Sequence, residues 1–269
     1  MELDMAAALL AAEEAALAAQ QVIDEYVSRG DWKVTLKSDN SPVTEVDLAA
    51  EQAIKSVLVR ALPQAAFFGE ETGAADAAIA DAEGARLRWL VDPIDGTKSF
   101  IRGMRYYSTQ IALEVDQQIR LGVSNAPAYG ERVTAVLGQG TRLDGRRIHC
   151  SEITSIDDAF FSAGNLTTLA RDASRWSRYG TLVSRARRVR GYGDFCHYHQ
   201  LCSGQADLVL ESDVNILDIA ALSLAVAEAG GIMTDMTGQP VTEATTSVLA
   251  ACTVALHDEA LSLLHGPRS

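Results

Sequence analysis

The sequence is poor in cysteine, and it has neither the residue pattern expected of an export signal at its start nor a long uncharged apolar run. It has four cysteines in 269 residues. Few cysteines without an export signal favour reduced thiols and a cytoplasmic location. The N-terminus opens acidic, has no basic segment, and carries Glu13 and Glu14 within its apolar run. We therefore expect neither a signal peptide nor a transmembrane helix.

Basic residues are also in the minority. The chain has 23 Lys and Arg against 36 Asp and Glu, which gives a net charge of −13 and a pI near 4.8. An acidic surface repels nucleic acids and anionic lipids, so we predict no nucleic-acid or membrane partner. A small anionic substrate is still compatible with this charge if a bound metal ion supplies local positive charge.

Hydrophobic residues make up 48% of the chain, and it has no repeat of fixed period. A chain of this length can therefore bury one large core or two packed subdomains. The pattern changes from α+β to α/β near residues 145–155. We predict an N-terminal α+β subdomain over 1–150 and a C-terminal α/β subdomain over 151–269.

The first half opens with helical patterns. Residues 4–28 predict an amphipathic helix that Gly30 stops. After a polar loop, Thr44 is the predicted N-cap of a second helix, with Asp47 in its first turn as in a capping box.

Strand patterns follow these helices. Residues 86–91 predict a buried strand that ends at Asp92, and four short runs after it predict an antiparallel meander. Past residue 150 the pattern alternates between strands and helices. The predicted strands are 159–164, 187–193, 206–212 and 231–235, and the predicted helices are 194–204, 218–231 and 257–265.

Acidic residues gather beside turn-forming residues in two stretches, "FFGEETG" and "WLVDPIDGTKSF". Like charges a few ångströms apart resist joint ionisation, so such carboxylates need a reason to lie together. In the second stretch, Pro93 and Gly96 favour an irregular segment. That segment can direct Asp92, Asp95 and the carbonyl of Ile94 into one space. Hard oxygen ligands of this kind suit Mg²⁺.

Each stretch alone has an ordinary interpretation. Asp-Pro and Asp-Gly steps are common in turns, and a Glu-Glu pair is commonly a solvated surface pair. A purely structural cation site is a second alternative. The two stretches together favour a functional metal site, in which the backbone amides of Gly96 and Thr97 can face a phosphate.

Three features in this order resemble the inositol monophosphatase superfamily of Mg²⁺-dependent, lithium-sensitive phosphomonoesterases. They are G-E-E, then D-P-I-D-G-T, then an aspartate that opens a late helix ending in A-G-G. The resemblance runs from "KSDNSPVTEVD" to "AEAGG" and covers nearly the whole chain. It implies a layered α-β-α-β-α sugar-phosphatase fold of mixed α+β and α/β class, with two packed subdomains, and a homodimer.

The resemblance also implies roles for individual residues. The ligands of two Mg²⁺ ions, and of a weaker third, would be Glu70, Asp92, Ile94 through its carbonyl, Asp95 and Asp218. Thr97 and Asp47 would hold the attacking water, with Glu71 in support. One departure is Leu217, which stands where the family usually has tryptophan before the late aspartate; the helix pattern after it is intact.

The second half resembles the histidinol-phosphatase branch of this family. In that branch a strand like R-V-R is followed by a glycine-aspartate pair, which here is Gly193 and Asp194. Glu211 matches the position of the family's substrate-contacting glutamate. Two carboxylates would pair with the ammonium and imidazole of L-histidinol phosphate, whereas a neutral polyol gains less from them. The structural alternative for Asp194 is a helix N-cap.

The stretch "CHYHQLC" at 196–202 suggests zinc at first sight. Cys196, His199 and Cys202 are spaced by threes, but structural zinc normally uses separated ligand pairs around a turn, which disfavours a zinc site. His197 or His199 can still border the substrate pocket. The basic stretch 185–190 is either a solvated strand edge or an anion-attracting patch.

The sequence therefore predicts a Mg²⁺-dependent phosphomonoesterase that acts on a small-molecule phosphate ester. L-Histidinol phosphate is the first candidate, which would place the enzyme in histidine biosynthesis. Inositol-1-phosphate is the second candidate, and a nucleotide bisphosphate is the third. The chain has no G-x-S-x-G nucleophile elbow. A metal-binding scaffold without catalytic activity is the alternative from another class.

Overall fold

The computed structural model describes residues 3–37, 41–75 and 86–265, so residues 38–40 of the predicted polar loop lie outside the described part. The chain divides into two compact units, Met1–Leu137 (unit 1) and Gly138–Ser269 (unit 2). The sequence-based prediction placed the boundary at residue 150. The last hairpin of the predicted meander therefore falls in unit 2 rather than in the N-terminal part.

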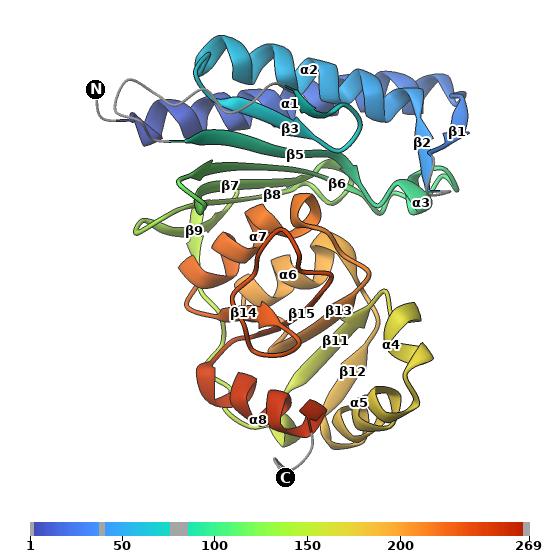
Figure 1. Cartoon of the computed structure of the whole chain (residues 1–269), viewed down its shortest axis with the longest axis vertical. Helices are drawn as coiled ribbons and strands as arrows, with labels where there is room; N and C mark the ends of the chain where they lie inside the picture. Colours follow the sequence, from blue (N-terminus) through green and yellow to red (C-terminus); the bar gives the residue numbers. More distant parts are fainter. Residues whose placement is uncertain (1–2, 38–40, 76–85, 266–269) are drawn as a thin grey trace. The chain divides into compact units, whose positions relative to one another are not determined.

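Two long helices and a sheet build unit 1. Helices α1 and α2 lie side by side on one face of the sheet (Figure 1). The strands of unit 1 follow the order β8-β7-β6-β5-β3-β4, and β1 and β2 form a separate hairpin. The bounds are α1 (Met5–Arg29), β1 (Val34–Leu36), β2 (Pro42–Thr44), α2 (Glu45–Ala61), β3 (Ala66–Gly69), β4 (Gly73–Ala75), β5 (Leu87–Asp95), α3 (Thr97–Phe100), β6 (Ser108–Val115), β7 (Gln118–Ala126) and β8 (Glu131–Val136).

The predicted helix ends are confirmed. Helix α1 ends at Gly30, whose φ of 75° is left-handed and favours glycine. Helix α2 begins at the predicted capping box, in which the N–H of Thr44 donates to Asp47 Oδ2 at 2.7 Å. This cap holds Asp47 in the first turn of the helix.

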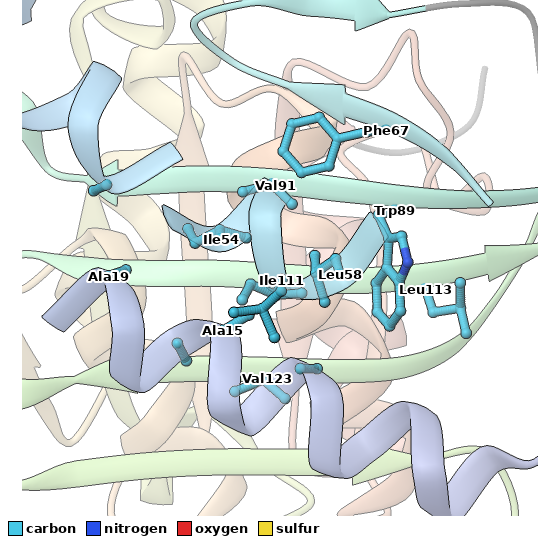
Figure 2. Close-up of a cluster of buried hydrophobic side chains, with 14 of the residues drawn as sticks. Ala15, Ala19, Ile54, Leu58, Phe67, Trp89, Val91, Ile111, Leu113 and Val123 are labelled. Atoms are coloured by element: carbon cyan, nitrogen blue, oxygen red, sulfur yellow. The ribbon is translucent and has the colours of Figure 1, made fainter. Parts of the chain in front are cut away.

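A hydrophobic core lies between the two helices and the sheet of unit 1. Burying one large aliphatic or aromatic side chain stabilises a protein by about 1.5–3 kcal/mol. This core therefore fixes the middle of β5, whose end carries the two aspartates of D-P-I-D. Figure 2 shows the cluster, with Ala15, Ala19, Ile54, Leu58, Phe67, Trp89, Val91, Ile111, Leu113 and Val123 labelled.

Helix α1 is long and apolar enough, by length and composition alone, to cross a membrane. The mean hydropathy of its 18-residue window is 1.2, and 39% of that window is buried. Two of its glutamates pair with neighbours inside unit 1, Glu13 with Arg132 at 3.3 Å and Glu14 with Arg60 at 3.0 Å. The alanine face of α1 packs in the core of unit 1, as in a core helix.

Unit 2 is built around a five-stranded mixed sheet of order β12-β11-β13-β15-β14. Helices α6 and α7 cover one face, and α5 and α8 cover the other (Figure 1). Strand β11 is parallel to both β12 and β13, while β15 is antiparallel to β13 and β14. The bounds are β9 (Gly140–Leu143), β10 (Arg146–Ile148), β11 (Phe160–Gly164), α4 (Thr167–Arg171), α5 (Ala173–Arg185), β12 (Arg188–Arg190), α6 (Asp194–Cys202), β13 (Leu208–Ser212), α7 (Ile216–Glu228), β14 (Ile232–Asp235), β15 (Ser247–Ala251) and α8 (Val254–His265).

The mixed α+β and α/β class is confirmed, as are the meander and the alternating second half. Two strand boundaries were wrong. The predicted strand 187–193 ends at Arg190 as β12. The predicted strand 86–91 continues as β5 through Pro93 to Asp95, because β6 pairs with it on both sides of a β-bulge. Several observed elements have no counterpart among the predicted ones, namely strands β1, β2, β3, β4 and β15 and helices α3, α4 and α5.

Candidate active site

The two acidic stretches of unit 1 meet at the ends of neighbouring strands. Strands β3 and β5 are parallel, with Gly69 beside Val91, so their carboxyl ends lie at the same edge of the sheet. The N–H of Glu70 donates to the carbonyl of Val91 at 3.1 Å, which sets Glu70 next to Asp92. Ligands of sheets with parallel strands bind at such carboxyl ends.

The aspartates of D-P-I-D are both buried. Asp92 is 2% exposed and Asp95 is 7% exposed. Asp92 Oδ1 accepts a hydrogen bond from the N–H of Ile94 at 2.9 Å, and Asp95 Oδ2 accepts one from Ser108 Oγ at 3.1 Å. A β-bulge separates the two aspartates, and bulges of this kind re-aim side chains next to active sites.

Thr97 links this segment to helix α2. Its Oγ1 lies 3.0 Å from the carbonyl oxygen of Ile94 and 3.2 Å from Asp47 Oδ1. A hydroxyl has one hydrogen to donate, so these two acceptors share it. Burial raises the pKa of Asp47, although hydrogen bonds from Thr44 oppose the shift. Asp47 and Thr97, which the sequence named for one role, are therefore in contact.

Lys37 is a site residue that the sequence analysis missed. Its Nζ lies 3.0 Å from Glu70 Oε1 and 2.9 Å from Glu71 Oε2. Burial raises the pKa of Glu71 to about 7, partly opposed by the hydrogen bond from Lys37. Burial lowers the pKa of Lys37, but the hydrogen bond to Glu71 and the charge of Glu70 outweigh it, and the net shift is upward. The ammonium group of Lys37 contacts both glutamates, so the surroundings of Glu70 and Glu71 favour a positive charge.

The donor set of unit 1 fits Mg²⁺. It comprises carboxylates and a backbone carbonyl, which are the hard oxygen ligands that Mg²⁺ prefers. Asp92 and Asp95 are buried, and burying carboxylates is costly unless positive charge or hydrogen bonds compensate them. A divalent cation would supply that compensation, as Lys37 does for Glu70.

Glu51 is a second residue that the sequence analysis missed. It is 1% exposed, and it accepts hydrogen bonds from the N–H groups of Glu71 at 2.8 Å and Thr72 at 3.0 Å. A Cβ added at Gly69 would lie only 2.4 Å from Glu51 Cδ, so the glycine of G-E-E leaves room for this carboxylate. Its spacing of four residues from Asp47 places both acids on one face of α2, which was the available signal.

In unit 2, the predicted substrate residues also follow parallel strands. Asp194 comes shortly after β12, and Glu211 lies near the end of β13 beside Gly164 of β11. Asn165, which the sequence analysis did not name, follows directly after β11. Three neighbouring carboxyl ends therefore deliver polar side chains to one edge of this sheet.

Glu211 is 1% exposed and lies at the centre of this group. Two protein donors approach each of its carboxylate oxygens, so hydrogen bonds within unit 2 hold the side chain in place. The four donors are Asp194 N at 2.8 Å, Asn165 Nδ2 at 3.2 Å, Tyr198 Oη at 2.8 Å and His197 Nε2 at 3.0 Å.

The backbone around Asp194 is held in a sparsely populated conformation. Asp194 has φ 48° and Asn165 has φ 47°, while Gly193 has φ 94°. Left-handed backbone at non-glycine residues costs of order 1–3 kcal/mol and persists where its surroundings enforce it. Gly193 rather than Asp194 is the N-cap of α6, and no side chain caps this helix. The alternative of a simple Asp194 N-cap is therefore not what the structure has.

Asp218 lies in the first turn of α7, as predicted. Its Oδ2 accepts from the N–H of Asn215 at 2.7 Å, which completes a capping box at the start of the helix. Leu217, in place of the expected tryptophan, is 6% exposed and leaves this start intact. Within the described residues, neither Cys196 nor Cys202 of α6 forms a disulfide, and Gln200 Nε2 donates to Cys196 Sγ at 3.4 Å.

Comparison with known proteins decides the family. The model of the inositol monophosphatase family matches residues 4–266. The chain belongs to the inositol monophosphatase family. It is therefore a phosphoric monoester hydrolase, as the sequence predicted, and a scaffold without activity is disfavoured.

Individual relatives agree with this family. The chain is 36% identical to a histidinol-phosphatase of Streptomyces coelicolor, with 87% of this chain and 88% of the relative covered. It is 35% identical to a histidinol-phosphatase of Mycobacterium tuberculosis, with coverage of 87% and 89%. Among solved structures, an inositol monophosphatase from Zymomonas mobilis is 32% identical, with a TM-score of 0.81 and coverage of 96% and 97%.

Proposed function

We propose that this family member is a Mg²⁺-dependent L-histidinol-phosphate phosphatase. The observation that carries the catalytic part is the junction of β3 and β5, where Glu70 starts beside Asp92. The D-P-I-D-G-T segment also carries the buried carboxylate of Asp95 and the hydroxyl of Thr97, which contacts Asp47. The substrate part is supported by the Asp194–Glu211 contact in unit 2 and by the histidinol-phosphatase relatives.

The acidic residues would hold two metal ions. Glu70, Asp92 and the carbonyl of Ile94 would bind the first. Asp92 and Asp95 would bind the second, and the family resemblance adds Asp218 as a further ligand. A weaker third ion near Glu70 and Asp47 is part of the same proposal. When bound, Mg²⁺ would supply the positive charge that activates a water molecule and stabilises the leaving oxygen.

The chain's own contribution to the water is the Thr97–Asp47 pair. When Thr97 Oγ1 donates its hydrogen to Asp47 Oδ1, its lone pairs are left to accept a hydrogen from the attacking water. Burial of Asp47 raises its pKa, which makes it a better proton acceptor. Glu71, whose pKa is also raised by burial, supports the same water in this proposal.

The phosphate would be held by backbone amides of Gly96 and Thr97. Phosphoryl transfer requires positioning and charge neutralisation more than covalent chemistry. No cysteine is needed as a nucleophile, and burial raises the pKa of Cys150 and Cys202 above the usual value of a thiol.

The cationic end of the substrate would be bound in unit 2. We propose that Asp194, carried by the Gly193–Asp194 turn, pairs with the ammonium or imidazole group. Glu211 holds the N–H of Asp194 at 2.8 Å and adds its negative charge to the same region. A neutral polyol offers no cation for these two acids, which favours histidinol phosphate over inositol-1-phosphate.

The test is phosphate release from three substrates under identical Mg²⁺ conditions. We expect kcat/KM to be highest for histidinol phosphate, lower for inositol-1-phosphate and lowest for adenosine 3′,5′-bisphosphate. A wild-type preference for inositol-1-phosphate would overturn the substrate assignment but leave the metal assignment standing. Release that is independent of Mg²⁺ would overturn the metal assignment.

Three further properties follow from the family resemblance. We propose that the enzyme is a cytoplasmic homodimer and that lithium inhibits it by competing at the metal site. Light scattering of the purified protein tests the dimer, because a monomeric mass would contradict it. A rate that stays unchanged in millimolar lithium would contradict the inhibition.

A further inference from the structure

Strand β6 opens with three consecutive polar residues that are all buried. Ser108 is 0% exposed, and Thr109 and Gln110 are each 1% exposed. The rest of the strand, from Ile111 onward, is mostly apolar. Buried polar side chains are unfavourable unless they have hydrogen-bond partners, so the partners of this tripeptide explain its presence.

All three side chains bond to the D-P-I-D segment or to each other. Ser108 Oγ donates to Asp95 Oδ2 at 3.1 Å, and Thr109 Oγ1 donates to the carbonyl of Pro93 at 2.9 Å. Gln110 Nε2 lies 2.8 Å from Ser108 Oγ and 3.1 Å from Ser124 Oγ of the next strand, β7. Its distance to Asp95 Oδ2 is 3.5 Å, at the limit of a hydrogen bond.

The backbone of β5 explains why side chains of β6 form the hydrogen bonds to the D-P-I-D segment. The pairing of β5 with β6 shifts between Asp92, which faces Gln110, and Asp95, which faces Ser108. Pro93 has no N–H to offer to the ladder. The regular ladder is therefore interrupted where the two aspartates stand, and the tripeptide supplies hydrogen bonds in its place.

The burial of Gln110 is unfavourable in one respect, and packing alone does not explain why a glutamine stands here. Within the described residues, its Oε1 is buried without a hydrogen-bond partner. An unpaired buried acceptor is destabilising, and a leucine of similar size would avoid that loss of stability. What a leucine cannot supply is the Nε2 group, which donates to two hydroxyl oxygens.

We propose that Gln110 and Ser108 form a relay that positions Asp95 for metal binding. The amide of Gln110 donates to Ser108 Oγ, so the single hydroxyl hydrogen of Ser108 is directed to Asp95. That bond fixes the rotamer of the Asp95 carboxylate. Both are positioning residues, because they act through Asp95. The inference rests on the proposed role of Asp95 as a Mg²⁺ ligand.

The test measures Mg²⁺ binding to the full-length protein by calorimetry, without substrate. Partners that orient a metal ligand typically contribute about 10–100-fold in metal affinity. We expect Ser108→Ala to raise the Kd for Mg²⁺ by about tenfold or more and Gln110→Leu to raise it in the same direction. Because Gln110 acts through Ser108, the double variant should bind no more weakly than Ser108→Ala alone.

Two further variants separate the possible outcomes. Glu114→Gln weakens the partly buried ion pair with Arg88 between the same two strands, and its Kd for Mg²⁺ should equal that of wild type even if the variant is less stable. Asp95→Asn should weaken binding most. If Asp95→Asn binds Mg²⁺ as wild type does, the proposed metal site is wrong. If Asp95→Asn weakens binding but Ser108→Ala does not, the relay is wrong. Ser108→Ala alone decides this if Gln110→Leu does not fold.

Discussion

The contact between Glu51 and the G-E-E turn makes a prediction about stability. Glu51 accepts two backbone hydrogen bonds, at 2.8 Å from Glu71 and 3.0 Å from Thr72. A hydrogen bond to a charged group contributes about 1.5–3 kcal/mol, so Glu51→Ala should destabilise the protein by about 3–6 kcal/mol. At about 2 °C per kcal/mol for a chain of this size, the Tm should fall by about 6–12 °C.

Gly69→Ala should damage the same contact from the other side. A Cβ at this position would lie 2.4 Å from Glu51 Cδ, so the carboxylate must leave its two N–H partners. Without the carboxylate, the clash disappears. The double variant Glu51→Ala/Gly69→Ala should therefore have the Tm of Glu51→Ala rather than a further loss.

Thermal unfolding followed by circular dichroism measures all three variants. Gln52→Ala is the control, because Gln52 is the next residue of α2 and is exposed. We also expect Glu51→Ala to lower Mg²⁺ affinity, since the turn carries Glu70. Additive Tm losses in the double variant, or a Glu51→Ala protein as stable as the Gln52→Ala control, would refute the reasoning.

Three other predictions follow from the site and from unit 2. Adding Mg²⁺ to metal-free protein should raise its Tm, because an ion that binds only the folded state stabilises it; an unchanged Tm at saturating Mg²⁺ would count against the site. Asp194→Ala should raise KM for histidinol phosphate about ten- to a hundredfold, from the loss of one charge-assisted hydrogen bond, and should change p-nitrophenyl phosphate hydrolysis little; equal effects on both substrates would argue against a substrate contact. Burial lowers the pKa of His257, partly opposed by Asp258 at 3.7 Å. The folded state therefore favours the neutral imidazole of His257. This contribution to the free energy of unfolding is present above the unfolded pKa of about 6.5 and is lost as pH falls below it. Between pH 7 and pH 5 the urea midpoint of wild type should therefore fall relative to that of His257→Gln; identical slopes in both proteins would exclude a contribution from His257.

Sequence patterns were reliable where a local signal determines the structure. The capping box of Thr44 and Asp47, the left-handed Gly30 and the strands of the meander all depend on residues close in the chain. These local rules also put Asp47 in the first turn of a helix. They placed Asp92 and Asp95 in the same segment beside the strand, which limited where their side chains could be.

The sequence was less informative where distant segments meet. The end of β5 was predicted at Asp92, because Pro93 normally interrupts a strand, but the buried polar residues of β6 extend the pairing to Asp95. Lys37 and Glu51 contact the G-E-E turn from far away in the chain, Lys37 from 33 residues before Glu70 and Glu51 from 20 residues before Glu71. Lys37 opens the quoted stretch KSDNSPVTEVD, but no local pattern gave either residue a role at the site. The surroundings of Glu211 depend on three strands brought together by the fold.

The central claim is that the D-P-I-D segment and Glu70 form a metal site on which phosphate release depends. The most direct test titrates free Mg²⁺ in a histidinol phosphate assay with wild type and Asp95→Asn side by side. We predict saturable activation of wild type, no release in excess chelator, and a rate lower by orders of magnitude for a folded Asp95→Asn variant. Full activity in chelator, or an Asp95→Asn variant with the Mg²⁺ dependence and rate of wild type, would contradict the account.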